Sequence, residues 1–275
     1  MIIGITGGKG GTGKSTVATA LAYALAKDSR VLLIDADVDC PNDHLLLSVK
    51  REFLEEVNQR IPKFDLDKCT KCGDCGPVCK KNALLSIKGR PPLLFKQQCN
   101  GCGACLLSCK PKAISWDKKT IGKIYSGWNH NIRLISGELS ENEPISEFVV
   151  NRLNELVSEL KKDFDYVLID TAAGTHCPVI TALEGCDKVI CVTEPTPLGA
   201  HDLEIILQLL KRLDINTSVI INRSDVGDIS LIQDLLSRYG TETICNIPYS
   251  EEIVDCYANG KPIEAEFVDE VLKRI

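Results

Sequence analysis

The 275-residue sequence contains no apolar run long enough to span a bilayer. Its longest runs, such as VLLI at 31–34 and YVLI at 166–169, fall far short of the roughly 20 residues that a membrane helix needs. The N-terminal stretch MIIGITGGKG also lacks the charged start and apolar segment of a signal peptide. The sequence therefore predicts a cytoplasmic protein.

The C-terminal stretch IEAEFVDEVLKRI lacks the basic face of a membrane-binding amphipathic tail. Its apolar residues follow helical spacing, while the opposite face mixes acidic and basic side chains. The apolar stripe consists of Phe267, Val268, Val271, Leu272 and Ile275. We predict a helix packed on the protein core and no stable membrane anchor.

Aromatic residues make up only 5% of the chain, and they do not accompany the lysines of its most basic segment. Residues 64–118 hold ten Lys/Arg and four Asp, a net charge of +6, whereas the rest of the chain carries −12. In that segment the lysines alternate with cysteines, not with the aromatic platforms on which nucleic-acid bases stack. We therefore expect no nucleic-acid binding, and the abrupt change in charge predicts a separate module.

Short apolar runs alternate with helical patterns over most of the chain. Buried strands are predicted from IIGIT (2–6), VLLID (31–35), YVLID (166–170), KVICVT (188–193) and TSVIIN (217–222). Helices are predicted over 15–27 and near 145–161, 200–213 and 228–239. Because strands that alternate with helices form a mostly parallel sheet covered on both faces, the predicted fold class is α/β.

The alternation stops between Phe64 and Lys118, where the chain repeats itself. Residues 69–84 and 99–114 share the pattern C-x2-C-G-x-C-x3-C-K-x2-A followed by Leu or Ile. A repeat of this kind indicates a duplicated mini-domain. We predict an inserted domain at 64–118 within one discontinuous domain that comprises 1–63 and 119–275.

A glycine-rich loop, GKGGTGKST, matches the phosphate-binding pattern G-x4-G-K-[ST] directly after a predicted strand and before a predicted helix. Glycines let backbone N–H groups curl around phosphate oxygens. Lys14 would contact the β- and γ-phosphates, and Ser15 would ligate Mg²⁺. The predicted nucleotide-binding residues of the loop are Gly8, Lys9, Gly10, Gly11, Thr12, Gly13, Lys14, Ser15 and Thr16.

Lys9, a second lysine early in this loop, marks the deviant form of the phosphate-binding loop. With it the chain resembles the MinD/ParA/nitrogenase-iron-protein class of P-loop ATPases over 1–63 and 119–275. The resemblance implies ATP as the nucleotide and a nucleotide-sandwich dimer with a second copy or a related ATPase. It also implies that Lys9 reaches the partner's nucleotide, which makes Lys9 a catalytic candidate beside Lys14.

The same resemblance assigns roles to acidic residues at the ends of two strands. In DADVDCPN, Asp37 matches the residue that activates water, and Asp35 and Asp39 are the alternatives. Asp170, at the end of YVLID, matches the Walker B carboxylate of the family.

Three further segments resemble functional parts of these ATPases. Thr171 to Gly174 match the second switch, which senses the γ-phosphate. Asn222 in VIINRS matches the residue that hydrogen-bonds the base edge, although asparagine at a strand end is also a common cap. Pro248 in NIPYSEEI matches the loop that closes over the base.

Fourteen cysteines in a reducing compartment argue for metal ligation rather than for disulfides. Eight of them form two runs of C-x2-C-x2-C-x3-C, and an iron–sulfur cluster needs four thiolates. The runs resemble those of bacterial two-cluster ferredoxins, although Lys80 and Lys110 stand where that pattern has proline. A pair of zinc sites is the alternative.

We predict two [4Fe–4S] clusters, in which the fourth cysteine of each run ligates the other cluster. One cluster takes Cys69, Cys72, Cys75 and Cys109. The other takes Cys99, Cys102, Cys105 and Cys79. Because the module stays basic after two clusters are counted, we expect its redox or cluster-acceptor partner to present an acidic face.

The remaining cysteines give weaker signals. Cys177 follows Asp170 closely, at the place where the nitrogenase iron protein has a cysteine that ligates a cluster between two subunits; a small buried hydrophobe is the alternative. Cys40 lies in the first switch. The cysteines expected in the core are Cys186, Cys191 and Cys245.

The predicted function is an ATP-hydrolysing iron–sulfur protein. Its nucleotide state would control electron transfer to a partner protein or the assembly of a metallocluster on that partner. The alternative is a positioning switch like MinD or ParA, with clusters that sense redox state. Clusters that cycle by one electron would indicate electron transfer, a labile cluster would indicate assembly, and ATP-dependent binding to membrane or DNA would indicate positioning.

Overall fold

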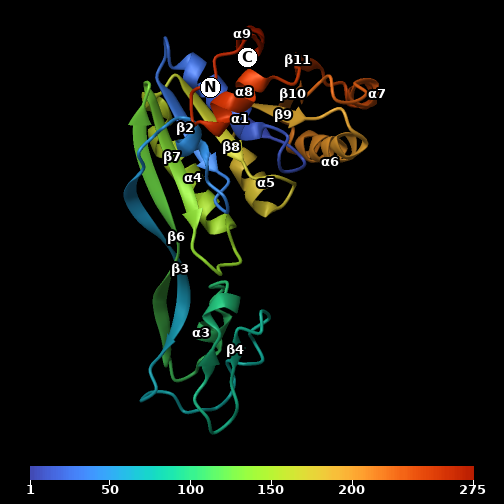
Figure 1. The fold of residues 1–275 in the computed structure, drawn as a ribbon. Helices are drawn as coiled ribbons and strands as arrows, with labels where there is room; N and C mark the ends of the chain where they lie inside the picture. The colour runs from blue at the N-terminus through green and yellow to red at the C-terminus, as the bar shows by residue number, and fades with distance from the viewer. The chain divides into compact units, whose positions relative to one another are not determined.

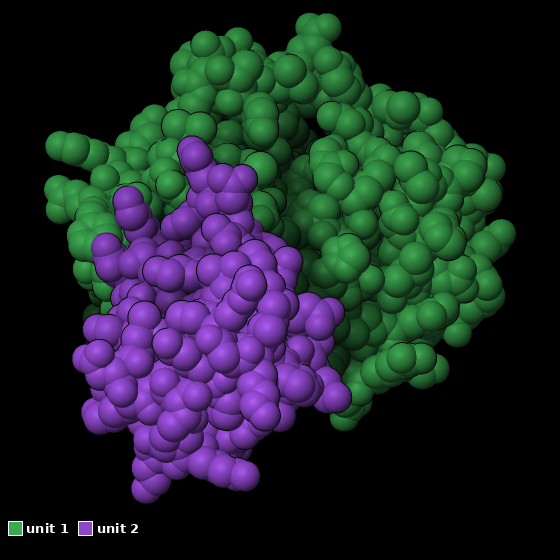
Figure 2. Space-filling view, turned by 90° about the horizontal axis from the view of Figure 1, so that it is seen from below, with its two compact units in different colours: residues 1–55, 124–138, 149–275 green, residues 56–123, 139–148 purple.

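The computed structural model describes residues 1–275, which form two compact units (Figures 1 and 2). Unit 1 comprises Met1–Glu55, Ile124–Glu138 and Val149–Ile275. Unit 2 comprises Glu56–Lys123 and Leu139–Phe148. The whole of the predicted insert therefore lies in unit 2, which extends beyond it at both ends.

A nine-stranded sheet has the order β11-β10-β9-β1-β8-β2-β7-β6-β3. Every neighbouring pair from β11 to β7 is parallel, so the predicted α/β fold with a mostly parallel sheet is confirmed. These strands are β1 (Ile2–Thr6), β2 (Val31–Ala36), β7 (Ile132–Leu139), β8 (Tyr166–Thr171), β9 (Lys188–Thr193), β10 (Asn216–Asn222) and β11 (Thr243–Ile247).

Two long strands at one edge of the sheet, β3 (Glu52–Phe64) and β6 (Ile114–Asn129), were missed in the sequence. Two residues with positive φ, His130 and Asn131, join β6 to β7, which is the geometry of a tight antiparallel hairpin. Directly after the insert the chain therefore forms an antiparallel strand pair rather than an alternation of strand and helix. Exposed polar residues interrupt the apolar pattern of β3, which hides it from a search for buried runs.

Helices lie on both faces of the sheet, and each of the predicted ones is present within a few residues (Figure 1). None of them is long and apolar enough to cross a membrane. The helices that lie wholly or, for α4, mostly in unit 1 are α1 (Lys14–Leu25), α2 (Asp43–Leu46), α4 (Glu147–Leu160), α5 (Cys177–Leu183), α6 (Pro197–Leu213), α7 (Ser230–Tyr239), α8 (Glu251–Ala258) and α9 (Glu266–Leu272).

The core of unit 1 consists of two apolar layers, one on each face of the sheet. Strand β9 shows the division, because Ile190 belongs to the layer under α1 and α9 while Val189 belongs to the layer under α5, α6 and α7. The buried side chains of α9, Phe267 and Val271 among them, pack into the first layer. The C-terminal helix is therefore part of the core, as predicted.

Unit 2 contains little regular structure beyond the ends of β3 and β6. It holds the two-residue antiparallel strands β4 (Leu84–Leu85) and β5 (Leu93–Leu94) and the short helix α3 (Ala104–Ser108). Within 64–118 the only buried residues are Ala83, Leu84 and Ala113. So small an apolar core contributes little to the stability of this segment.

Candidate nucleotide site and cysteine sites

The phosphate-binding loop connects β1 to α1, as predicted. Gly11 and Gly13 have φ angles of 81° and 95°, which L side chains rarely adopt. A Cβ at Gly13 would also collide with the side-chain amide of Asn222. No side chain caps the start of α1, so the backbone N–H groups of its first turn are free to bind an anion.

Lys14 and Ser15 form the first turn of α1. The Lys14 side chain is buried and its Nζ donates a hydrogen bond to the carbonyl oxygen of Lys9 at 3.2 Å. Ser15 Oγ donates to Asp170 Oδ2 at 2.6 Å. Asp170 is on β8, the neighbour of β1, and parallel strands bring their carboxyl ends to one edge of the sheet. The predicted Mg²⁺ ligand and the predicted Walker B carboxylate are therefore in contact.

Three carboxyl groups, those of Asp35, Asp43 and Asp170, are almost fully buried at this edge. Both oxygens of Asp43 and Oδ1 of Asp170 have no hydrogen-bond partner. Burial raises the pKa of Asp170 to about 7. Burial, with the charge of Asp170 next, raises the pKa of Asp35 and of Asp43. Because unpartnered carboxylate oxygens are the ligands that Mg²⁺ prefers, the donor set fits this ion.

The three candidates for water activation lie in different surroundings. Asp35 is buried, and its oxygens accept the backbone N–H groups of Asp37 and Asp43. Asp39 is exposed to solvent. Of the three, only Asp37 lines the cavity into which the phosphate-binding loop opens, called the nucleotide cavity below. Burial raises the pKa of Asp37, and the charge of Lys14 opposes that rise. Position therefore favours Asp37, whose role stays a prediction.

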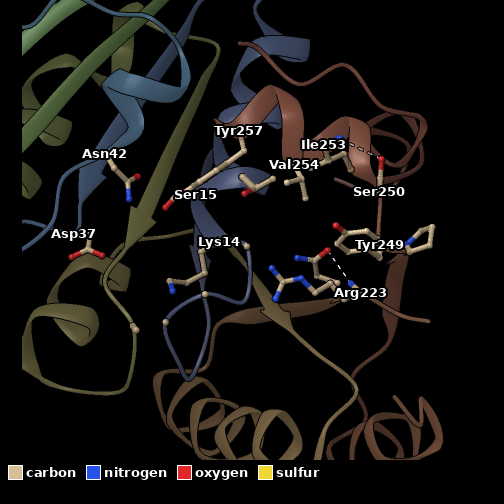
Figure 3. A pocket seen from close by; sticks show the side chains of 17 residues that line it. Lys14, Ser15, Asp37, Asn42, Arg223, Tyr249, Ser250, Ile253, Val254 and Tyr257 are labelled. Atoms are coloured by element: carbon tan, nitrogen blue, oxygen red, sulfur yellow. Dashed lines mark hydrogen bonds between the residues drawn. The ribbon is translucent and has the colours of Figure 1, made fainter. Parts of the chain in front are cut away.

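The loop opens into a cavity of about 370 Å³ (Figure 3). Figure 3 shows Asp37 and Asn42 on one side of it and Arg223 and Tyr249 on the other, with Lys14 between them. The predicted base-site residues Asn222 and Pro248 also line it. The lining residues that the sequence did not single out are Asn42, Arg223, Tyr249, Ser250, Ile253, Val254 and Tyr257, of which only Val254 and Tyr257 lie outside the segments matched to the family.

Helix α8 brings several of these missed residues to the cavity. Ser250 caps it, since its Oγ accepts the backbone N–H of Ile253 at 3.2 Å. Val254 and Tyr257, which line the cavity, are 44% and 48% exposed. Their proximity to the phosphate-binding loop arises from tertiary packing, and only the neighbouring Pro248 gave a signal in the sequence.

Asn222 contacts the phosphate-binding loop directly. Its Nδ2 donates to the carbonyl oxygen of Thr12 at 2.8 Å, and its Oδ1 accepts the backbone N–H of Arg223 at 2.9 Å. The side chain thus joins the end of β10 to the loop as well as lining the cavity. Its predicted contact with a base remains to be tested.

Lys9 does not line the cavity. Its Nζ forms an ion pair with Glu194 Oε2 at 3.0 Å, and Glu194 Oε1 accepts Arg223 Nη1 at 2.6 Å. Glu194 is buried, which strengthens both contacts. The lysine predicted to reach a partner's nucleotide is therefore held by its own chain, and this ion pair must open for that contact to form.

The predicted second switch lies against the phosphate-binding loop. Thr171 Oγ1 donates to Thr6 Oγ1 at 3.0 Å, and the N–H of Gly174 donates to the carbonyl oxygen of Gly7 at 3.2 Å. Cys177 follows at the start of α5, where it is exposed. No group of metal-ligating side chains surrounds it, so its ligand role stays a hypothesis.

The three cysteines that the sequence placed in the core lie in or against it. Cys191 and Cys245 are buried, and Cys186 is partly buried against the layer under α5. Burial raises the pKa of Cys186 to about 12, which keeps this thiol protonated and inert at neutral pH.

The eight predicted ligand cysteines surround two separate cavities in unit 2. The first cysteine site is lined by Cys69, Cys72, Cys75 and Cys109. The second cysteine site is lined by Cys79, Cys99, Cys102 and Cys105. The fourth cysteine of each run therefore lies with the first three of the other run, which is the arrangement expected for crossed ligation.

No group of three or more Cys, His, Asp or Glu side chains lies close enough together to hold a metal ion. A [4Fe–4S] cluster needs four thiolates. All of these cysteines are free thiols, and the segment that carries them has almost no apolar core. Two rings of four thiols thus fit cluster ligation by their number and grouping.

Residues 3–263 match the CobQ/CobB/MinD/ParA nucleotide binding domain. The chain belongs to this family. The match passes across the segment that contains the eight cysteines.

Relatives of known sequence support the assignment over nearly the whole chain. An uncharacterized protein of Methanocaldococcus jannaschii is 35% identical over 262 residues, which cover 95% of this chain and 90% of that protein. The septum site-determining protein MinD of Thermotoga maritima is 26% identical over 271 residues, 95% of this chain and 80% of its own length.

A solved structure shows the same fold. MinD of Pyrococcus horikoshii, complexed with Mg-ADP, aligns with a TM-score of 0.60 at 20% sequence identity. The alignment covers 95% of this chain and 86% of the MinD chain. The shared element is the parallel sheet with its covering helices.

Proposed function

We propose that the protein is an Mg²⁺-dependent ATPase whose unit 2 carries two [4Fe–4S] clusters. Nucleotide state would control the delivery of electrons, or of a metallocluster, to an acidic partner protein. The two four-cysteine sites carry this proposal, because nucleotide binding alone gives no reason for eight thiols at this spacing. The family assignment supports only the nucleotide-binding half.

In the nucleotide half, each residue role follows from position. Lys14 and the N–H groups of the glycine loop bind the phosphates. Ser15, with Asp170 behind it, would hold Mg²⁺, which supplies charge neutralisation on the phosphates. Asp37 orients the attacking water, and its raised pKa makes it a stronger base. The Mg-ADP bound to the MinD of P. horikoshii supports this assignment.

Dimerisation is also part of the proposal. The complex of MinC with MinD from Aquifex aeolicus, whose MinD fold is shared, shows that a protein of this fold assembles with partners. In a dimer Lys9 would leave Glu194 and reach the partner subunit's nucleotide. Glu194 would then keep its ion pair with Arg223, which lines the cavity.

In the cysteine half, the thiolates of each site would hold one cluster. Such a cluster, when bound, supplies one-electron redox chemistry. The surrounding lysines, exposed in the structure, attract an acidic surface and orient it toward the cysteine sites. These residues include Lys68, Lys71, Lys80, Lys81 and Lys96.

Anaerobic purification followed by iron and acid-labile sulfide analysis tests the proposal. About eight iron atoms and about eight sulfides per chain are expected, and about two zinc ions without sulfide would overturn it. EPR spectra recorded with and without ATP, before and after mixing with an apo-acceptor, separate electron delivery from cluster transfer. The Lys14→Ala variant is the control, since it should keep its iron and lose any response to ATP.

The similarity to MinD over 95% of the chain favours a second candidate, a positioning switch with redox-sensing clusters. Such a switch requires ATP-dependent binding to a membrane or to DNA. Co-sedimentation with anionic lipid vesicles and with DNA, each with and without ATP, distinguishes it. Binding in either assay would favour the switch over electron or cluster delivery.

A further inference from the structure

The two cysteine sites differ at one pair of equivalent positions. Each residue of the first run corresponds to the residue 30 positions later in the second run, as Cys69 and Cys99 do. Ser86 lies two residues after the end of the first repeat, and Trp116 lies two residues after the end of the second, so the same correspondence pairs Ser86 with Trp116. A hydroxyl therefore stands beside the first cysteine site where an indole stands beside the second.

Ser86 contacts a ligand sulfur of the first cysteine site. Cys75 Sγ lies 3.3 Å from Ser86 Oγ, and the thiol donates the hydrogen bond. A thiolate, the form that binds iron, has no proton to donate. Once Cys75 is a thiolate, the Ser86 hydroxyl becomes the donor and the sulfur the acceptor. Ser86 is partly buried, which shields this hydrogen bond from water.

Trp116 provides no such hydrogen bond at the second cysteine site. Its ring packs over the cysteine loop, where a Cβ at Gly103 would lie 3.1 Å from a carbon of the indole. No hydrogen bond joins Trp116 to a cysteine sulfur in the structure. The indole covers the loop and leaves the sulfur atoms without a side-chain donor.

The other contacts of the sulfur atoms do not remove this difference. Backbone N–H groups donate to sulfur at both sites, that of Ala113 to Cys109 Sγ at 3.2 Å and that of Gly101 to Cys99 Sγ at 3.4 Å among them. The positive charge of Lys119 also favours a thiolate at Cys99 of the second site. Lys119 Nζ, however, forms an ion pair with Glu143 Oε2 at 2.6 Å, which offsets that charge. Both sites thus have backbone donors, and the side-chain hydroxyl of Ser86 is what distinguishes the first site from the second.

We propose that Ser86 makes the first cysteine site the more easily reduced of the two. This inference rests on the proposed function, since it requires a cluster in each site. Reduction adds one electron and one negative charge, shared with the sulfur ligands, and a hydroxyl donor stabilises that charge without proton transfer. The first electron from a low-potential reductant then resides in the first site, and the second site fills at lower potential.

Potentiometric titration of the cluster-loaded protein with dithionite and mediators, followed by EPR, tests this proposal. The wild type should show two one-electron steps. Ser86→Ala should lower the equilibrium constant of the first step roughly tenfold, about 59 mV for a one-electron couple, and leave the second step in place. Ser86→Thr, which keeps a hydroxyl, should restore the wild-type first step.

Ser115→Ala is the matched control, because Ser115, next to Trp116 in the sequence, is exposed and has no contact with a sulfur atom. Both reduction steps of this variant should equal those of the wild type. Unchanged steps in Ser86→Ala, or a shift in the second step only, would overturn the proposal. Iron and sulfide analysis of each variant separates this failure from failure of the proposed function. A chain without clusters refutes both, whereas loaded chains with unaltered potentials refute only the role of Ser86.

Discussion

At the scale of single residues, the nucleotide site is arranged around buried charge. Lys14 is buried beside the loop backbone, and the carboxyl groups of Asp35, Asp43 and Asp170 are buried at the adjoining strand ends. Buried carboxyl groups that repel one another destabilise the folded chain unless a cation joins them. The site is therefore expected to gain stability when Mg²⁺ and a nucleotide bind.

Replacing Lys14 by Ala should weaken ATP binding by about 10- to 100-fold, because a charge-assisted hydrogen bond to phosphate is lost. Isothermal titration calorimetry with a non-hydrolysable ATP analogue measures the change. Lys27→Ala is the matched control, since Lys27 lies beyond the end of α1 and pairs with Glu264. Equal affinities of the Lys14 variant and the wild type would contradict the assigned role.

The stability of the free protein should fall as the pH rises between about 4 and 7. Burial raises the pKa of Asp170 to about 7 from an ordinary value of 3.8, so the folded chain retains a proton that the unfolded chain releases. Where the unfolded state binds fewer protons, stability decreases with pH. Thermal unfolding over this range, without Mg²⁺ or nucleotide, measures the slope.

Asp170→Asn should reduce that slope, because it removes one titrating carboxyl group and the repulsion it exerts on Asp35 and Asp43. Asp39→Asn, at an exposed position in the same loop, should leave the slope as in the wild type. An Asp170 variant with the wild-type slope would show that this carboxyl group does not control the pH dependence.

At the scale of elements, packing explains why short helices persist. Helix α9 is only 7 residues long, and an isolated helix of that length is unstable in water. Its buried side chains join the apolar layer that contains α1 and the central strands. The helix is therefore stabilised by tertiary contacts rather than by its own hydrogen bonds.

Val271→Ala should destabilise the protein by about 2 kcal/mol, because it leaves a cavity where a fully buried side chain was. Lys273→Ala, on the exposed side of the same terminus, should change stability by less than about 0.5 kcal/mol. Urea denaturation of both variants gives the comparison. A neutral Val271 variant would mean that α9 is not part of the cooperative core.

At the scale of the whole molecule, the two chemistries occupy different units. Every residue that lines the nucleotide cavity is in unit 1, and all eight predicted ligand cysteines are in unit 2 (Figure 2). Strands β3 and β6 each belong in part to both units, so the chain passes between the units within regular structure. Each site should consequently assemble without the other.

The Cys102→Ser variant should lose about half of its iron, since one of the two sites lacks a thiolate. Its affinity for an ATP analogue should stay within about twofold of the wild type, because no cysteine lines the nucleotide cavity. Cys186→Ser, a change in unit 1 away from both cysteine sites, is the control for iron content. Loss of nucleotide binding in Cys102→Ser would contradict the independence of the two sites.

Local pattern alone determined much of this protein. The run IIGIT followed by the glycine loop predicts a buried strand, a phosphate-binding turn and a helix, because apolar runs and glycines act on neighbouring residues. The spacing of the eight cysteines predicts which four belong together, and the cavities show that grouping. In the first case the signal lies within one short segment of chain, and in the second it lies in two short repeated runs.

Only the tertiary structure decided the features that join distant segments. Strand β3 is partly exposed, so its apolar pattern is weak, and the pairing of an edge strand depends on its neighbour rather than on its own residues. Tyr257 lines the nucleotide cavity because packing places α8 there, and Lys9 pairs with Glu194 for the same reason. The sequence by itself determined the chemical groups available at each site, whereas the packing of distant elements decided which of them meet.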